Sequence, residues 1–324
     1  MFLRGQVIGK YRILSSLGSG GFGTVYLAED TWIDKKVALK VPHKQNLDFN
    51  EMIKEPRLLA SMSHPNIVTV LTAEKEDGVF FIVMEYVQGE TLEHIIMRDG
   101  ALELTRALDF SCQILNAVDH AHRASILHRD LKPENLLICG PLSTEPQVKI
   151  LDFGLAKIRE ADFMDPKSMT MTGVAMGTFG YMSPEQLAGE DVDQRTDVYA
   201  IGVIALETLT GRLGTEGLGF HRTIETELHT RLIAAAVTAP QRRVASAIGR
   251  ALAPNRAARY ASIADMRAEL VPAIRECPVM PLSGTDQRTA ARGVATAALT
   301  RDIGTSDGVT TTDAPTGPPA DPDR

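Results

Sequence analysis

The chain of 324 residues lacks the features of a secreted, membrane-spanning or nucleic-acid-binding protein. Its three cysteines, Cys112, Cys139 and Cys277, are odd in number and lack the spacing of a metal site, so we expect reduced thiols. No apolar run reaches the roughly 18 residues of a membrane span, and residues 1–10 lack the apolar region of a signal peptide. The formal net charge of −7 argues against general nucleic-acid binding. Together these absences favour a cytoplasmic protein without a membrane span and without a nucleic-acid partner.

Large apolar side chains are also nearly missing from residues 278–324, which are rich in Thr, Ala, Gly, Pro and Asp. Such a segment cannot bury enough surface to fold alone. We therefore predict a disordered tail over residues 277–324 and a folded domain over residues 11–276. The overall composition, with 44% hydrophobic and 23% charged residues, is that of a globular protein.

The most informative stretch is residues 128–135, which read His-Arg-Asp-Leu-Lys-Pro-Glu-Asn. Asp130 can orient and deprotonate a hydroxyl group, and Lys132 can stabilise charge on a transferred phosphoryl group. Asn135 and Asp152, which begins an Asp-Phe-Gly motif, carry the oxygen atoms that magnesium prefers. These residue types fit phosphoryl transfer, which depends mostly on positioning and electrostatics.

A glycine-rich segment, residues 18–23, lies between two β-prone runs near the start of the chain. A dinucleotide-binding loop of similar composition opens a helix, whereas this one passes into the β-branched and aromatic residues 24–28. Glycine allows a backbone to lie over phosphates because no Cβ atom intervenes. We interpret the segment as a phosphate-binding hairpin, with a plain flexible hairpin as the alternative.

Taken in order, these motifs resemble those of the eukaryotic-type (Hanks-type) serine/threonine protein kinases, and they are closest in pattern to the bacterial soluble members. Residues 177–185, Gly-Thr-Phe-Gly-Tyr-Met-Ser-Pro-Glu, complete the resemblance. It implies the α+β bilobal protein kinase fold. An antiparallel β-sheet N-lobe with a helix C would occupy about residues 11–87, and a mainly helical C-lobe about residues 88–276.

The resemblance also implies an activity and the residues that perform it. The activity is ATP-dependent phosphorylation of serine or threonine hydroxyls on protein substrates, with ATP and Mg²⁺ or Mn²⁺ as cofactors. The catalytic residues are Asp130, Lys132, Lys40 and Glu55, the last two as an ion pair. The metal ligands are Asn135 and Asp152. The nucleotide-binding residues are Leu17, Gly18, Ser19, Gly20, Gly21, Phe22, Gly23, Thr24, Val25, Ala38, Lys40, Glu85, Val87 and Leu137.

Four further residues have structural roles by the same resemblance: Thr178, Glu185, Asp197 and Arg259. Thr178 is expected near Asp130, and Glu185 is expected to pair with Arg259. Asp197, at the start of a helix that is apolar all round, is expected to cap the backbone of the catalytic loop in a dry environment.

Helix C departs from the family pattern because Pro56 follows Glu55 directly. Proline inside a helix removes a backbone donor and clashes with the preceding turn, at a cost of about 3 kcal/mol or more. It is tolerated in the first helical turn. Either helix C begins near Lys54 or it is kinked at the ion pair, and we predict a shortened helix.

Other helices follow from apolar spacing and stop signals. Residues 104–122 are predicted as an amphipathic helix. His120 and His122 are two positions apart, whereas side chains that face each other on a helix are three or four apart, so we interpret them as packing or surface residues and not as a metal site. The buried helix after Asp197 is expected to stop at Gly211. The last helix, residues 262–276, is expected to bend or split at Pro272.

Regulation is expected through phosphorylation. Ser168, Thr170 and Thr172 lie in a polar segment after the Asp-Phe-Gly motif and are candidate sites for autophosphorylation in a transient homodimer. Arg129 precedes the catalytic aspartate, as in kinases that are activated in this way. The tail can carry phosphothreonines for a phosphothreonine-reading partner, on Thr285, Thr289, Thr296, Thr300, Thr305 and Thr310.

Two alternative functions stay open. One is a pseudokinase-like scaffold, which the complete set of catalytic residues argues against and which Pro56 and the atypical segment 213–220 favour. The other is a small-molecule phosphotransferase with the same fold, which Lys132 and the complete 177–185 segment argue against.

Overall fold

The computed structural model describes residues 2–20, 23–43, 45, 49–142, 145–153, 180–211, 236 and 238–277. None of the helices in these ranges is long and apolar enough to cross a membrane. Several predictions concern positions outside the described residues: Gly21, Phe22, Ser168, Thr170, Thr172, Thr178, the segment 213–220 and the tail 278–324.

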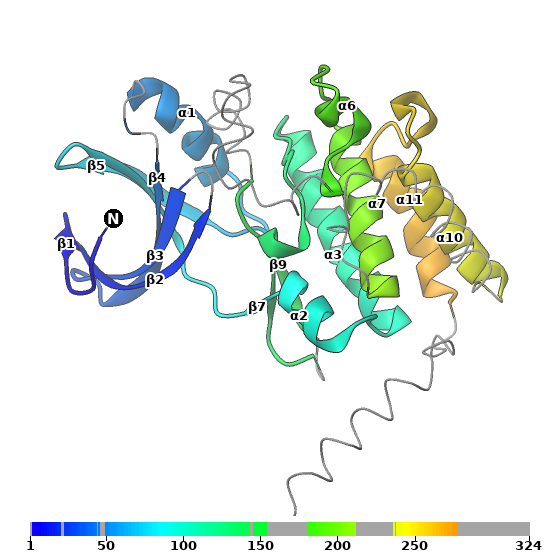
Figure 1. Cartoon of the computed structure of the whole chain (residues 1–324), viewed down its shortest axis with the longest axis horizontal. Coiled ribbons are helices and arrows are strands. Elements are labelled where there is room, and N and C mark those ends of the chain that lie inside the picture. Colours follow the sequence, from blue (N-terminus) through cyan, green and yellow to red (C-terminus); the bar gives the residue numbers. More distant parts are fainter. Residues whose placement is uncertain are drawn as a thin grey trace, which may run out of the picture. The chain divides into compact units, whose positions relative to one another are not determined.

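The N-terminal lobe is built on an antiparallel sheet whose strand order, in the described part of the chain, is β1-β2-β3-β4-β6-β5 (Figure 1). The strands are β1 Val7–Ile8, β2 Tyr11–Gly20, β3 Gly23–Asp30, β4 Lys35–Pro42, β5 Val70–Glu76 and β6 Val79–Glu85. The described glycines of this segment lie on the two antiparallel strands β2 and β3, as the predicted hairpin requires, with Gly20 opposite Gly23. A Cβ atom on Gly23 would lie 2.5 Å from the Val41 carbonyl oxygen, so glycine is required for this approach of β3 to β4.

Helix α1, Phe49–Ala60, contacts β5 beside this sheet. The prediction of a shortened helix that begins near Lys54 is wrong, because α1 begins at Phe49 and passes through Pro56. Met52, Pro56 and Leu59 are buried at helical spacing. Burial of this face stabilises the helix and offsets the backbone hydrogen bond that Pro56 cannot donate.

The C-terminal lobe is mainly helical in its described residues. Its helices are α2 Leu92–Asp99, α3 Leu104–Arg123, α6 Pro184–Leu187, α7 Arg195–Thr210, α10 Ala239–Ala251 and α11 Ile263–Arg275, with the 3-10 turns η1 Pro133–Asn135 and η4 Arg256–Ala258. A small sheet joins β7 Glu90–Thr91, β8 Leu136–Cys139 and β9 Gln147–Ile150 in that order.

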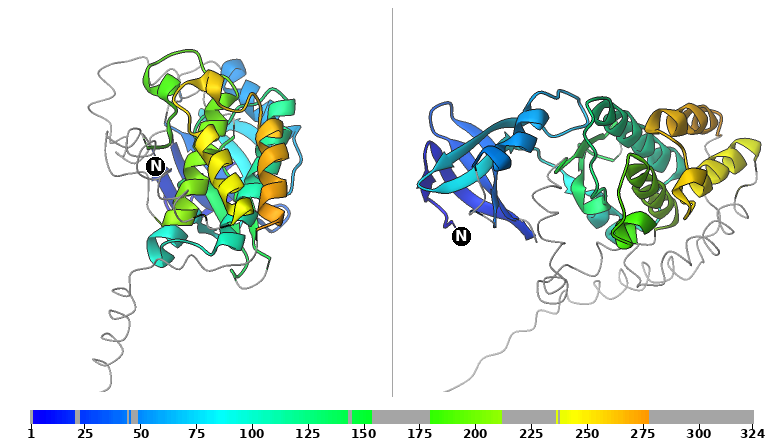
Figure 2. Two further views of the ribbon diagram at one scale, coloured as in Figure 1. Left: turned by 90° about the vertical axis from the view of Figure 1, so that its right-hand side faces the viewer. Right: turned by 90° about the horizontal axis from the view of Figure 1, so that it is seen from above.

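Helix α7 is the centre of this lobe. Every residue from Thr196 to Leu209 is buried, as the apolar sequence predicts, and α7 contacts α3, α10 and α11 (Figure 2). The helix ends at Gly211, whose φ of 68° lies in the left-handed region that suits glycine. Helix α11 continues through Pro272 as one element, so the predicted split does not occur.

Replacement of Pro56 by alanine tests how α1 tolerates a proline. The Pro56→Ala variant supplies an N–H group that can donate to the carbonyl of Met52, one turn earlier. We expect the free energy of unfolding to rise by about 1–3 kcal/mol. Urea denaturation followed by circular dichroism measures this change. An unchanged or lower stability would show that packing of the buried proline ring outweighs the missing hydrogen bond.

Candidate active site

An ion pair between Lys40 and Asp152 connects the two lobes. Lys40 is near the end of β4 and is only 5% exposed, and its Nζ lies 2.6 Å from Oδ2 of Asp152. A buried ammonium group needs such a partner, since an isolated charge in this environment is costly. Glu55 lies on α1 and is partly buried. Its pairing with Lys40 stays a prediction.

The expected nucleotide-binding residues lie on neighbouring strands next to this pair. Val25 is opposite Gly18 on one side and opposite Lys40 on the other. Ala38 is opposite Met84 near the end of β6, and Leu137 belongs to β8 of the other lobe.

At the connection between the lobes, Glu85 is already engaged. Its N–H donates to the Thr69 carbonyl oxygen, at 3.0 Å. Its carboxylate accepts from Lys149 Nζ at 2.7 Å and from the Thr69 N–H at 2.9 Å. Glu85 is therefore fixed through both its backbone and its side chain, at the place where the adenine base of ATP is expected to bind.

The catalytic loop, residues 128–135, places three polar side chains together. Nζ of Lys132 lies 3.8 Å from Oδ2 of Asp130. Asn135 donates through Nδ2 to the backbone carbonyl oxygen of Asp130 at 2.8 Å and to its Oδ2 at 3.1 Å. The candidate base thus has a cation and an amide beside it.

The two expected metal ligands lie on segments that are hydrogen-bonded to each other. The carbonyl oxygen of Asn135 accepts from the N–H of Leu151, at 2.8 Å, and Leu151 directly precedes Asp152. Because Asn135 uses Nδ2 toward Asp130, its Oδ1 is the side-chain atom that can bind a cation. An amide oxygen and a carboxylate are donors that fit a hard divalent cation.

Asp197, in the first turn of α7, accepts hydrogen bonds from the backbone of this loop, as predicted. It is fully buried. Its Oδ2 accepts from the His128 N–H at 2.9 Å and its Oδ1 accepts from the Arg129 N–H at 2.8 Å. Burial alone would raise the pKa of Asp197, but hydrogen bonding from His122, the positive potential of His122 and His128, and the backbone donor hold it below its ordinary value.

His122 is a partner of Asp197 that was not predicted from the sequence. Its Nε2 lies 2.7 Å from Oδ2 of Asp197, and its side chain is 6% exposed. His122 lies on the same face of α3 as the buried Leu115 and Val118. A polar group on a buried face needs a hydrogen-bond partner, and this spacing could have predicted one for His122.

His128 is structural, in line with the expectation from the family. Its ring packs edge-to-face on Phe153 with centroids 4.7 Å apart, and its Nε2 lies 2.8 Å from the Leu151 carbonyl oxygen.

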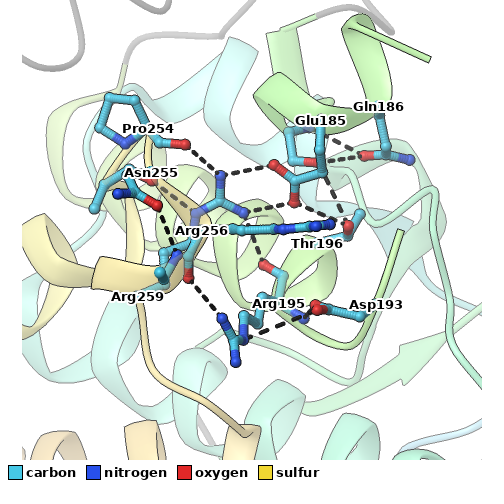
Figure 3. A network of polar contacts seen from close by, with 12 residues as sticks. Glu185, Gln186, Asp193, Arg195, Thr196, Pro254, Asn255, Arg256 and Arg259 are labelled. Atoms are coloured by element: carbon cyan, nitrogen blue, oxygen red, sulfur yellow. Dashed lines mark hydrogen bonds and ion pairs between the residues drawn. The ribbon is translucent and has the colours of Figure 1, made fainter. Parts of the chain in front are cut away.

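The predicted pair of Glu185 and Arg259 is present and buried (Figure 3). Arg259 donates through its two terminal nitrogens to the two oxygens of Glu185, at 2.7 Å and 2.9 Å. Thr196 of α7 adds a hydroxyl donor to Glu185 at 3.1 Å. This network joins α6, α7 and the segment before α11.

Glu207 of α7 is a further buried carboxylate, and it was not recognised from sequence because its neighbours are mostly apolar. Tyr181 donates its hydroxyl to Oε2 of Glu207, at 2.8 Å. Burial raises the pKa of Glu207 to about 9; the Tyr181 hydrogen bond opposes this and the nearby Glu134 adds to it. The carboxyl is therefore protonated at neutral pH.

The N-terminal sheet carries a glycine-rich hairpin, and an ion pair between buried Lys40 and partly buried Asp152 joins this sheet to a mainly helical lobe. This architecture is the one expected of a nucleotide-dependent phosphotransferase. A family model described as the protein kinase domain matches residues 11–255. The chain belongs to this family. Its members use ATP and a divalent cation.

Bacterial relatives share a large part of the sequence. The chain is 39% identical over 277 residues to the serine/threonine-protein kinase pkn3 of Myxococcus xanthus, with 81% of this chain and 49% of that protein covered. It is 38% identical over 221 residues to the serine/threonine-protein kinase PrkC of Bacillus subtilis (strain 168), with 67% and 33% covered. The chain thus spans half or less of the length of these two relatives.

A solved structure supports the fold. The PknI kinase domain of Mycobacterium tuberculosis superposes with a TM-score of 0.61 at 24% identity, and the match covers 84% of this chain and all of that one. At this identity the likeness concerns the fold alone.

The contact of His122 with Asp197 can be tested by removing the donor while keeping a ring. We expect His122→Phe to lower the free energy of unfolding by about 1–3 kcal/mol, because a buried carboxylate loses one hydrogen bond. His120→Phe, two positions earlier and in ring contact with His64 at 5.1 Å, is the control and should change stability less. Equal losses in both variants would contradict the role of His122.

The protonation of Glu207 predicts a pH dependence of stability. The unfolded chain releases this proton near the ordinary pKa of 4.5, whereas the folded protein keeps it up to about pH 9. The folded state therefore binds one more proton at Glu207 in this window, and the contribution of Glu207 to stability falls as the pH rises from 4.5 to 9. We expect Glu207→Gln to flatten this slope in urea denaturation series. An unchanged slope would show that Glu207 is ionised in the folded protein.

Proposed function

We propose that this chain is an active serine/threonine protein kinase that transfers the γ-phosphoryl group of ATP to hydroxyl groups of protein substrates. The observation that carries the proposal is the set of contacts around Asp130. A cation and an amide lie beside its carboxylate, on a loop whose backbone is held by a buried acceptor. A fixed base with adjacent positive charge is what a loose phosphoryl-transfer transition state requires.

Each of these residues then has a defined task. Asp130 orients the acceptor hydroxyl and takes its proton, and Lys132 stabilises charge on the phosphoryl group in transfer. Lys40, held by Asp152, binds the phosphates of ATP beneath the hairpin of β2 and β3. Asn135 and Asp152 would hold Mg²⁺, or Mn²⁺ in its place. When bound, the cation neutralises the charge of the phosphates.

Regulation is part of the proposal. Autophosphorylation on Ser168, Thr170 or Thr172, in a transient homodimer, would activate the enzyme, and phosphothreonines of the tail would recruit a phosphothreonine-reading partner. All three cysteines lie in described segments and are free thiols, which supports a role in cytoplasmic signalling.

The two alternatives make different demands. Pro56 favours a pseudokinase-like scaffold, but α1 forms through this residue and keeps Glu55 within the helix, which weakens that argument. A small-molecule phosphotransferase would use the same catalytic loop on a non-protein acceptor.

Transfer of labelled phosphate from ATP to protein tests the proposed activity. The purified chain with Mg²⁺ should label a generic acceptor protein, and Asp130→Asn should reduce the rate by about 100-fold or more because the general base is lost. ATP binding, measured by calorimetry, should persist in this variant. An aminoglycoside panel serves as the alternative acceptor set. Labelling of that panel alone, or equal rates with and without Asp130, would contradict the proposal.

Intact mass and peptide mapping of the same reaction locate the modified residues. We expect phosphate on at least one of Ser168, Thr170 and Thr172, and none on a variant with Asp152→Asn. Phosphate only at other positions would contradict autophosphorylation of the segment after the Asp-Phe-Gly motif.

A further inference from the structure

We infer that Gln186 is a positioning residue for Asp130 and that it acts through the backbone carbonyl of Arg129. Gln186 lies on α6, far along the chain from the catalytic loop. Its Nε2 donates to the carbonyl oxygen of Arg129 at 2.8 Å. This carbonyl belongs to the peptide group that leads directly into Asp130. The inference rests on the proposed kinase activity and adds a residue that links the catalytic loop to α6.

The peptide group in question needs external support. Arg129 has a φ of 63°, in the left-handed region that a non-glycine residue rarely adopts. Such a conformation persists only where the surroundings hold it in place. Asp197 Oδ1 accepts from the Arg129 N–H, and Gln186 donates to the Arg129 carbonyl. The residue before the catalytic aspartate is therefore held on both of its peptide groups.

Gln186 is itself fixed at both ends of its amide. Its Oε1 accepts from the N–H of Ser183 at 3.0 Å and lies 3.3 Å from the Ser183 hydroxyl, which forms a capping box at the start of α6. The preceding residue, Glu185, carries the buried ion pair with Arg259 (Figure 3). The anchored α6 thus determines where Nε2 lies, and Nε2 in turn orients the peptide before Asp130.

Gln186 therefore combines two roles that can be separated by substitution. The capping box requires an acceptor, which glutamate supplies as well as glutamine. The contact with Arg129 requires a donor, which a carboxylate lacks, and Gln186→Glu would place an oxygen against the Arg129 carbonyl. A purely structural cap would accept this change, whereas a positioning residue would not.

The chain contains a matched control. At the start of α10, Thr238 and Gln241 form the same capping box, with the Thr238 N–H donating to Oε1 of Gln241 at 2.9 Å. Gln241→Glu makes the same chemical change in the capping box of α10, and not in that of α6.

Steady-state kinetics of the full chain with ATP·Mg and an acceptor protein is the test. We expect Gln186→Glu to lower kcat by about tenfold or more, because the base is displaced, with KM for ATP changed by less than about threefold. Gln241→Glu should keep kcat and KM, and both variants should keep their melting temperature. A kcat of Gln186→Glu within about twofold of the parent would overturn the inference.

Gln186→Met removes the donor and also the capping acceptor without adding charge. Paired with Gln241→Met, which removes the same capping acceptor from α10, it replaces Gln186→Glu if the carboxylate unfolds the protein, with the same expected loss of kcat relative to its control. Amide hydrogen exchange gives a readout that needs no activity. The Asp130 N–H should exchange faster in the Gln186 variants than in the parent and in Gln241→Glu, and equal rates would overturn the inference. If the parent chain transfers no phosphate, the proposed function fails, while the exchange comparison still decides the role of Gln186.

Discussion

The carboxylate of Asp197 is the group on which the rest of the candidate site depends. It is buried in a mostly apolar helix, where an ionised group is tolerated only if its oxygens are hydrogen-bonded. The donors are the N–H groups of His128 and Arg129 and the imidazole of His122. The need is mutual: the carboxylate requires these donors, and the catalytic loop obtains a fixed backbone from it.

The remaining contacts extend outward from this point. Asn135 holds Asp130 from within the loop, and its carbonyl oxygen holds the strand that ends before Asp152. Asp152 in turn pairs with Lys40 of the N-terminal sheet. The reactive groups are therefore attached to packed helices and strands, which gives the precision that a positioned reaction requires.

How much the sequence predicts depends on whether the signal is local. Short local patterns predicted several elements correctly. These are the two paired strands that carry the glycine segment, the amphipathic α3, and the buried α7 with its stop at Gly211. The start of α1 was predicted wrongly because the local penalty of Pro56 was given more weight than burial of the face that carries Met52 and Leu59. At Pro272 the helix α11 does not split, and the buried Leu270 and Ala273 lie on either side of the proline; a bend at this position stays a prediction.

Partners that are distant in sequence could not be predicted from local patterns. His122 meets Asp197 only because α3 packs on α7, and Glu207 meets Tyr181 only because α6 and its preceding turn fold back over the same helix. The pair of Glu185 and Arg259 is as distant, yet it was expected, because the resemblance to a family supplied information that spacing alone does not contain.

The most direct test of this account is amide hydrogen exchange at His128 and Arg129 in the protein without nucleotide. If the buried carboxylate fixes the loop before ATP binds, these two N–H groups exchange as slowly as the core amides of α7, and addition of an ATP analogue with Mg²⁺ changes their rates little. Rapid exchange without nucleotide, at the rate of an exposed loop, would contradict the claim that Asp197 organises the site in advance.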